Sequence, residues 1–159
     1  MTRILLVDDH ALFREGLARL LGNVPDLEIT SQCSTVEEAL ALMGQNTYDL
    51  VLLDYELGDR RGNEVVAAAR ERQFTGRILV VTVGVTRAEL RQLMNQGASG
   101  VFLKNNPPET LERAIQAIMR GETWIDPKYL QSSPEGGPAE IGRRARFTER
   151  DRIVLRGVF

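Results

Sequence analysis

Four apolar runs of this sequence end on polar residues whose side chains could do chemistry. Asp8 and Asp9 follow the first run, and Asp54, Thr82 and Lys104 end or follow the other three. Three carboxylates at one place repel one another unless a cation neutralises them, and a hard divalent ion with oxygen ligands would do so. Mg²⁺ fits best, because it uses one or two carboxylates and completes its shell with water and phosphate oxygens. If the fold brings these residues together, they predict a Mg²⁺ site suited to phosphoryl chemistry.

The residue types also suggest which chemical role each side chain would have. An aspartate can attack phosphorus and form an aspartyl phosphate. Lys104 would supply a positive charge and Thr82 a hydroxyl group for the remaining phosphoryl oxygens. Each residue alone has an ordinary structural explanation as a helix cap, a strand end or a solvated tip. That explanation is poor for polar residues at several corresponding strand ends, so we favour a functional site.

Alternating strand and helix patterns must position these side chains. Each of five apolar runs is followed by a helical pattern, which makes five βα units, and strands apolar on both faces indicate a parallel sheet covered by helices on each side. Ligands of such sheets bind at the carboxyl ends of the strands. The runs are ILLV, LEITSQCS, DLVLLD, RILVVT and GVFL, and the predicted helices span about 11–21, 34–43, 62–72, 87–95 and 107–119, with Gly44 and Gly97 closing the second and fourth.

Several separated motifs resemble those of a known family. LLVDDH, LVLLDYELGDRRG, VVT and GASGVFLK are similar to motifs of the receiver domain of two-component response regulators, and DDHALFREGL is similar to the opening of the NarL/FixJ (LuxR-type) subfamily. The resemblance covers about residues 1–121. It implies an α/β fold of the CheY-like or flavodoxin-like (βα)5 kind, a doubly wound five-stranded parallel sheet with strand order 2-1-3-4-5.

The resemblance also implies roles and partners. Asp54 would be the phosphoacceptor, and Asp9, Asp54 and the backbone carbonyl of Glu56 would bind Mg²⁺, with Asp8 assisting through water. Thr82 and Lys104 would contact the phosphoryl group. A sensor histidine kinase would be the phosphodonor, and phosphorylation would be linked to homodimerisation and to control of transcription by an attached DNA-binding domain. The chain would not be an enzyme beyond its own phosphotransfer and dephosphorylation.

Three positions need separate comment. The family usually carries proline where this chain has Gly58, so we expect a less rigid loop after the phosphoacceptor. The tyrosine or phenylalanine whose rotamer reports phosphorylation is replaced by Val101, and Phe102 points to the opposite face of the strand. His10, beside the acidic pair, has capping, packing and catalytic interpretations that stay open.

The end of the sequence differs in composition from the rest. FTERDRIVL resembles the first helix of a LuxR-type helix-turn-helix domain, with Thr148 as N-cap. We expect a receiver at 1–121, a flexible linker at 122–146 that contains SSPEGGP, and a truncated helix-turn-helix domain at 147–159 without its recognition helix. Trp124 and Ile125 are expected to pack against the last receiver helix. Specific DNA binding would belong to the missing part of that domain.

Composition bounds the remaining possibilities. The chain has 159 residues, 43% hydrophobic and 26% charged, which suits one domain and an appendage, and a net charge of -2 that argues against a surface devoted to nucleic acid. The single cysteine, Cys33, excludes an intramolecular disulfide. No signal-peptide or membrane-span pattern is present in the sequence, so we expect a cytoplasmic protein without membrane contact.

Two other classes of function remain as alternatives. A pseudo-receiver would act as an interaction or dimerisation module without phosphorylation, but the complete acidic site favours a phosphorylated receiver. A flavin-binding protein would need a hydroxyl- and glycine-rich phosphate loop after the first strand, where DDHALF offers carboxylates. An aspartyl phosphatase would place nucleophile and acid two residues apart on that strand, which Asp8 and Asp9 do not do.

Overall fold

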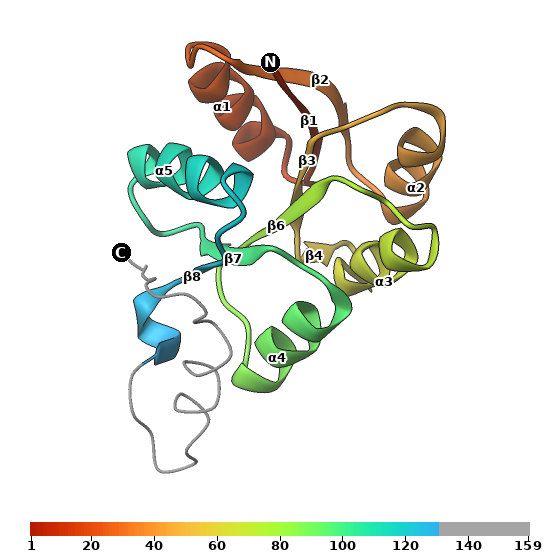
Figure 1. Ribbon diagram of the computed structural model, residues 1–159, viewed down its shortest axis with the longest axis vertical. Coiled ribbons are helices and arrows are strands. Elements are labelled where there is room, and N and C mark those ends of the chain that lie inside the picture. The colour runs from red at the N-terminus through yellow and green to blue at the C-terminus, as the bar shows by residue number, and fades with distance from the viewer. Residues whose placement is uncertain (131–159) are drawn as a thin grey trace.

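The structure is a computed structural model that describes residues 1–130. It is a parallel sheet with helices on both faces (Figure 1). The strands of the sheet are β1 (Thr2–Val7), β2 (Leu27–Cys33), β3 (Leu50–Asp54), β6 (Arg77–Thr82), β7 (Gly100–Leu103) and β8 (Trp124–Ile125). The helices are α1 (Ala11–Gly22), α2 (Val36–Gln45), α3 (Asn63–Glu71), α4 (Arg87–Gln96) and α5 (Pro108–Met119). A small hairpin, β4 (Glu56–Leu57) and β5 (Arg60–Arg61), follows β3, and a 3₁₀ turn, η1 (Pro127–Leu130), follows β8.

The strand order confirms the predicted topology. The sheet runs β2-β1-β3-β6-β7-β8, so its first five strands have the expected order 2-1-3-4-5, and every pairing is parallel. All five residues of β3, the third strand in this order, are buried. The carboxyl ends of β1, β3, β6 and β7 therefore lie side by side along one edge of the molecule.

Two helical layers bury the two faces of the sheet (Figure 1). Helices α1 and α5 cover one face, and α2, α3 and α4 cover the other. Successive strand residues enter opposite cores, as the period of two requires. The α1/α5 face takes Ile4, Leu6, Leu50, Leu52, Leu79, Val81 and Phe102, and the other face takes Leu5, Val7, Val51, Leu53, Val80, Val101 and Leu103.

A sixth strand lies where the sequence predicted the start of the linker at 122–146. Gly100 and Val101 of β7 pair with Trp124 and Ile125 of β8. The close approach requires glycine, because a Cβ at position 100 would lie 2.4 Å from the Trp124 carbonyl oxygen. The prediction of a flexible linker is therefore wrong for 122–130, because β8 and η1 belong to the folded unit, which extends to Leu130. The predictions for 131–146 and 147–159 fall outside the described residues.

The β8 residues pack on both faces of the sheet. Trp124 lies half-buried against the core shared with α5, as expected, whereas Ile125 is buried on the opposite face, in the core of α2, α3 and α4. The expectation that both residues pack against the last helix overlooked the alternation of a strand. Because its two side chains point to opposite faces of the sheet, β8 packs against both hydrophobic cores and attaches residues 124–125 to each.

Two helix boundaries show how local signals succeed and fail. The α4 helix has a capping box, in which Thr86 and Glu89 bond each other's backbone amides, and it closes at Gly97 with φ of 111°, as expected. The α2 helix is capped by Thr35, but it does not close at Gly44. It continues to Gln45, and the amide of Asn46 donates to the Leu42 carbonyl at 3.0 Å. Gly44 is simply part of the last turn.

Candidate functional site at the carboxyl ends of the strands

The predicted site residues all lie at one edge of the sheet. Asp8 and Asp9 follow β1, Asp54 ends β3, Thr82 ends β6 and Lys104 follows β7. The register aligns these ends: Asp54 lies opposite the residue before Thr82, and the amide of Lys104 donates to the Thr82 carbonyl at 2.7 Å. The fold thus brings the five residues into neighbouring positions.

Carboxylates and one imidazole form the centre of the site. Each of Asp8, Asp9, His10 and Asp54 offers a ligand atom, and these atoms lie within 4.8 Å of one another. Asp8 and Asp54 are only 2% and 3% exposed, whereas Asp9 reaches solvent. Oxygen atoms gathered so closely suit a hard cation that retains some water.

The His10 ring faces this cluster. His10 is the N-cap residue of α1, but its side chain makes no cap bond and is 67% exposed, so the ring neither caps the helix nor packs in the core. Its Nδ1 lies 3.3 Å from carboxylate oxygens of Asp8 and Asp9 and 3.7 Å from Asp54 Oδ2. The imidazole therefore lies at the solvent side of the acidic cluster.

Lys104 supplies the positive charge inside the site. Its Nζ lies 3.2 Å from Asp8 Oδ2 and 3.4 Å from Asp54 Oδ2. The same ammonium lies 4.3 Å from the centroid of the Phe13 ring, so a cation–π contact also holds the Lys104 side chain in place. One lysine beside two buried carboxylates leaves a net negative charge, before Asp9 is counted.

Burial makes that negative charge unfavourable at Asp54. Loss of water on burial and, after it, the charge of Asp8 raise the pKa of the Asp54 carboxyl to about 6, against the lowering effects of Lys104 and of the Glu56 amide. The Glu56 amide donates to Asp54 Oδ1 at 3.4 Å. A divalent cation beside Asp54 would relieve this repulsion, and the donor set therefore fits Mg²⁺.

The loop after Asp54 shows why glycine can replace proline here. Gly58 has φ of 67°, which proline cannot adopt, and its N–H, which proline lacks, donates to Asp9 Oδ2 at 2.9 Å. The loop is closed as a hairpin by the antiparallel pairing of β4 with β5, and the Arg60 guanidinium bonds Glu37 of α2 and Glu64 of α3. The departure at position 58 thus gives Asp9 a backbone partner.

Thr82 does not contact the acidic cluster directly. It is buried, and its hydroxyl donates to the Gly84 carbonyl and accepts from the Gly84 amide, both at 3.2 Å. These bonds fold the chain back after β6. For its hydroxyl to donate to a phosphoryl group on Asp54, Thr82 would have to release the Gly84 carbonyl, because a hydroxyl has one proton.

Sequence reasoning missed a buried tyrosine close to the Thr82 loop. Val101 and Phe102 lie in opposite cores, as expected, but Tyr129 of η1 is buried in the same core as Val101 and bonds to Val85. The available signal was the apolar pair Ile125 and Tyr129 on either side of an Asp-Pro turn. The linker interpretation overlooked it.

A doubly wound sheet with acidic residues at the ends of β1 and β3 and a lysine after β7 defines the receiver class of α/β domains. Residues 4–116 match the family model of the response regulator receiver domain, and the chain belongs to this family. The nitrate/nitrite response regulator protein NarL of Escherichia coli (strain K12) is 33% identical over 157 residues, which cover 96% of this chain and 73% of that protein. NarP of the same strain is 31% identical over 156 residues, covering 96% and 72%.

A solved structure agrees with this family. The two-component response regulator of the LuxR family from Aurantimonas sp. SI85-9A1 is similar with a TM-score of 0.76 and 31% identity, over 90% of this chain and 99% of that one. The chain thus carries a receiver domain of the NarL type, as the resemblance of its motifs indicated. Across residues 1–130, the helices are all too short or too polar to cross a membrane.

Proposed function

We propose that this chain accepts a phosphoryl group on Asp54 from a sensor histidine kinase. The observation that carries the proposal is the position of Asp54, buried at the end of β3, with Asp8 and Asp9 beside it and Lys104 at 3.4 Å. Burial leaves the carboxylate short of water, which favours its reaction with an electrophile. Membership of the receiver family and similarity to NarL-type regulators support the same assignment.

The transfer follows from the chemistry of these groups. A carboxylate oxygen of Asp54 attacks the phosphorus of a phosphohistidine, so an O–P bond forms and the P–N bond breaks. The electron pair of that bond goes to the ring nitrogen, and a protonated phosphohistidine leaves as neutral imidazole. Lys104 would neutralise one phosphoryl oxygen, and Thr82 would donate its hydroxyl to another. The chain is a substrate and acceptor in this step, not an enzyme acting on a separate metabolite.

Mg²⁺ would be held by Asp9, Asp54 and the carbonyl of Glu56, with Asp8 acting through water. Bound there, the ion would supply the positive charge that the carboxylates and phosphoryl oxygens require. The residues orient the site without it: the Gly58 amide fixes Asp9, and Lys104 fixes Asp8 and Asp54.

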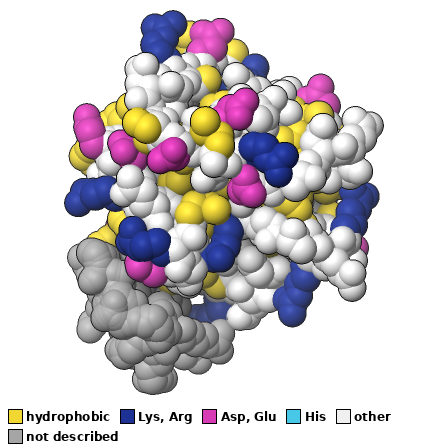
Figure 2. Space-filling model, turned by 45° about the horizontal axis from the view of Figure 1, so that its top comes forward, with side chains coloured by type: hydrophobic (Ala, Val, Ile, Leu, Met, Phe, Trp, Pro, Cys, Tyr) yellow, Lys and Arg dark blue, Asp and Glu magenta, His cyan; other side chains and the backbone are white. Residues whose placement is uncertain are grey.

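We further propose that phosphorylation controls a LuxR-type DNA-binding domain attached after the receiver, and is linked to homodimerisation. The relatives are response regulators, and the Aurantimonas protein is described as a LuxR-family member. On the face shown in Figure 2, basic and acidic side chains are interspersed, which suits protein contacts better than a nucleic-acid surface. Control of transcription would therefore pass through the attached domain.

The proposal is tested by phosphorylation of the whole chain with Mg²⁺ and acetyl phosphate, followed by intact-mass and peptide mass spectrometry. We expect one added phosphoryl group, located at Asp54, and none in Asp54→Asn or with EDTA. Asp49→Asn is the matched control, since Asp49 lies at the opposite end of β3. Undiminished phosphorylation of Asp54→Asn would contradict the assignment, and a wild type that takes up no phosphoryl group would favour a pseudo-receiver.

A further inference from the structure

The segment that follows β8 contacts the loop that leads away from Thr82. The Tyr129 hydroxyl donates to the Val85 carbonyl at 2.9 Å and accepts from the Val85 amide at 3.0 Å. The side chain is buried, so no water competes for these bonds. A third bond runs the other way, from the Arg87 guanidinium to the Tyr129 carbonyl at 2.8 Å. Tyr129 is therefore joined through its hydroxyl to loop 83–86 and through its carbonyl to the first residue of α4.

The same segment also contacts the loop that leads away from Lys104. Asn106 donates through its side-chain amide to Asp126 Oδ2 at 2.9 Å, and the Lys128 amide donates to Asp126 Oδ1 at 3.0 Å. Asp126 is buried, and the Tyr129 amide donates to its carbonyl at 3.0 Å. Residues 126–130 thus connect the loop that follows Thr82 with the loop that follows Lys104.

The hydrogen bonds of the Thr82 hydroxyl explain how phosphorylation could move the loop that Tyr129 contacts. The Thr82 hydroxyl is occupied by both backbone groups of Gly84, and Val85 is the next residue. When the hydroxyl donates its single proton to a phosphoryl oxygen, it must release the Gly84 carbonyl, and the chain that follows Gly84 is then free to shift. Val85 is the residue that Tyr129 holds, so a shift of this loop must either carry Tyr129 with it or break the two hydroxyl bonds.

Val101, the strand partner of Ile125, cannot transmit such a movement itself. Val101 is fully buried, has a single stiff χ angle and carries no hydrogen-bonding group. Its strand partner Ile125 leads directly through Asp126 into η1, and Tyr129 is buried in the same core. An aromatic ring with a polar tip therefore reaches this core from the end of the unit, not from β7.

We propose that Tyr129 is a positioning residue that transmits the phosphoryl-dependent movement of loop 83–86 to residues 126–130 and so to the chain that continues from residue 131. This rests on the proposed phosphorylation of Asp54. The hydroxyl group is the coupling element, since it makes both hydrogen bonds between the side chain and Val85. The ring fills the core in either state, and the two-state element is the loop between Thr82 and Thr86.

The test follows amide hydrogen exchange by NMR in the full chain, with and without Mg²⁺ and beryllofluoride, an analogue of the aspartyl phosphoryl group. In the wild type we expect exchange at the Gly84, Lys128 and Tyr129 amides to change by roughly fivefold, the scale of one net hydrogen bond. In Tyr129→Phe, which keeps the ring, we expect Gly84 to respond as before while the change at 128 and 129 falls below about twofold.

The matched control is Tyr48→Phe. Tyr48 is equally buried and donates its hydroxyl to Ser31 Oγ at 2.7 Å, remote from the Thr82 loop. This variant should lose comparable stability and keep the whole response. The inference is overturned if Tyr129→Phe retains the wild-type response at 128 and 129, or if the wild type responds at Gly84 alone. If beryllofluoride changes no amide near Asp54 in any variant, the phosphoryl site itself has failed, and the inference falls with it.

Discussion

Charged side chains lie in opposite environments at the two ends of the parallel strands. At the carboxyl ends, Asp8 and Asp54 are buried together, and the pKa of Asp54 is raised to about 6. At the amino ends, Asp49 sits at the surface and accepts from the Arg3 amide at 2.8 Å. The Arg77 guanidinium there donates to the Ile118 carbonyl at 3.0 Å. At the carboxyl ends, burial and the neighbouring carboxylate therefore oppose the charge of Asp54, whereas at the amino ends Asp49 and Arg77 each have a hydrogen-bonding partner.

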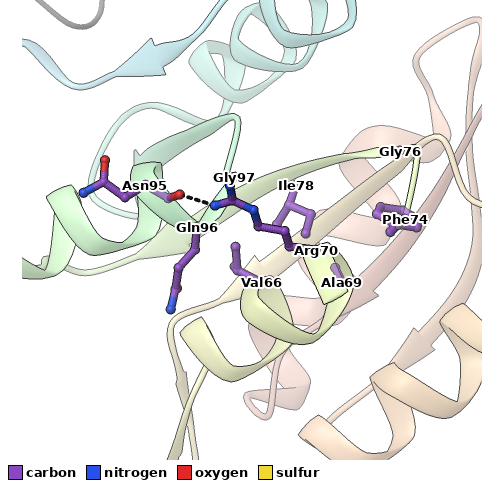
Figure 3. A pocket seen from close by; sticks show the side chains of 9 residues that line it. All are labelled: Val66, Ala69, Arg70, Phe74, Gly76, Ile78, Asn95, Gln96 and Gly97. Carbon is purple, nitrogen blue, oxygen red and sulfur yellow. Dashed lines mark hydrogen bonds between the residues drawn. The ribbon is translucent and has the colours of Figure 1, made fainter. Parts of the chain in front are cut away.

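A pocket at the amino ends sharpens the contrast. It has a volume of about 410 Å³ and lies between α3 and α4, where the Arg70 guanidinium donates to the Asn95 carbonyl at 2.5 Å (Figure 3). Its lining is apolar apart from Arg70 and two amide side chains, and includes no carboxylate. This hollow therefore holds no cluster of acidic groups. Buried, mutually repelling carboxylates distinguish the candidate site at the carboxyl ends from it.

Close packing, not charge, should dominate stability on the amino-end side. Gly100 begins β7, and a Cβ there would meet the Trp124 carbonyl oxygen at 2.4 Å. We expect Gly100→Ala to lower the free energy of unfolding by about 3 kcal/mol, measured by urea denaturation, as β8 is pushed away. Gly44→Ala is the control, because that glycine is helical and its Cβ would meet nothing within 4 Å. An undisturbed Gly100→Ala protein would show that β8 does not depend on this approach.

Removing the charge of Asp54 should stabilise the fold without metal. The pKa of Asp54 is higher in the folded chain than its ordinary value of 3.8, so the folded state binds the proton more tightly. Stability is therefore lost as pH rises from about 4 to about 6. In EDTA, Asp54→Asn should exceed the wild type by on the order of 2 kcal/mol at pH 8 and match it near pH 3. Equal stability at both pH values would contradict the buried repulsion.

Mg²⁺ should act on the same end of the strands. At ten times its dissociation constant we expect Mg²⁺ to raise the free energy of unfolding of the wild type by about 1.4 kcal/mol, as linkage requires. Asp9→Asn should lose most of this gain, whereas Asp49→Asn should keep it. The measurement is thermal unfolding over a Mg²⁺ titration. A gain that survives in Asp9→Asn would place the ion elsewhere.

The amino-end ion pair should matter least. The Arg3 and Asp49 side chains lie 3.7 Å apart and are both well exposed, and the shorter bond to Asp49 comes from the Arg3 backbone. Arg3→Ala should therefore change the free energy of unfolding by no more than about 0.5 kcal/mol, with no effect on the Mg²⁺ titration. Urea denaturation with and without Mg²⁺ checks both statements. A larger loss would mean that charge stabilises both ends alike.

The sequence predicted the carboxyl-end site because its signals are local. An apolar run that stops on Asp54 or Thr82 names both the strand and its end, and the parallel topology then requires the ends to meet. Helices on both faces of the sheet were predicted from the same patterns, whereas the strand order 2-1-3-4-5 came from the resemblance to the receiver family. Gly97 also marked a helix end correctly, because its φ is positive there.

What the sequence could not predict depends on partners distant along the chain. β8 has two residues, and its strand character comes from pairing with Gly100 and Val101. Tyr129 acquires its role from Val85, 44 positions away. The bond from Gly58 to Asp9 also spans a long separation, so a missing proline was read only as lost rigidity. Short segments of this kind have no periodicity that could identify them.

The central claim is that Asp54 sits in an environment that resists its charge until a cation arrives. The most direct measurement is an NMR titration of the Asp54 carboxyl carbon, in the full chain, with EDTA and with saturating Mg²⁺. We expect a pKa of about 6 in EDTA, where burial and Asp8 oppose ionisation, and a clear fall when Mg²⁺ is bound. A pKa near the ordinary value of 3.8 in EDTA, or one that Mg²⁺ leaves unchanged, would contradict the account.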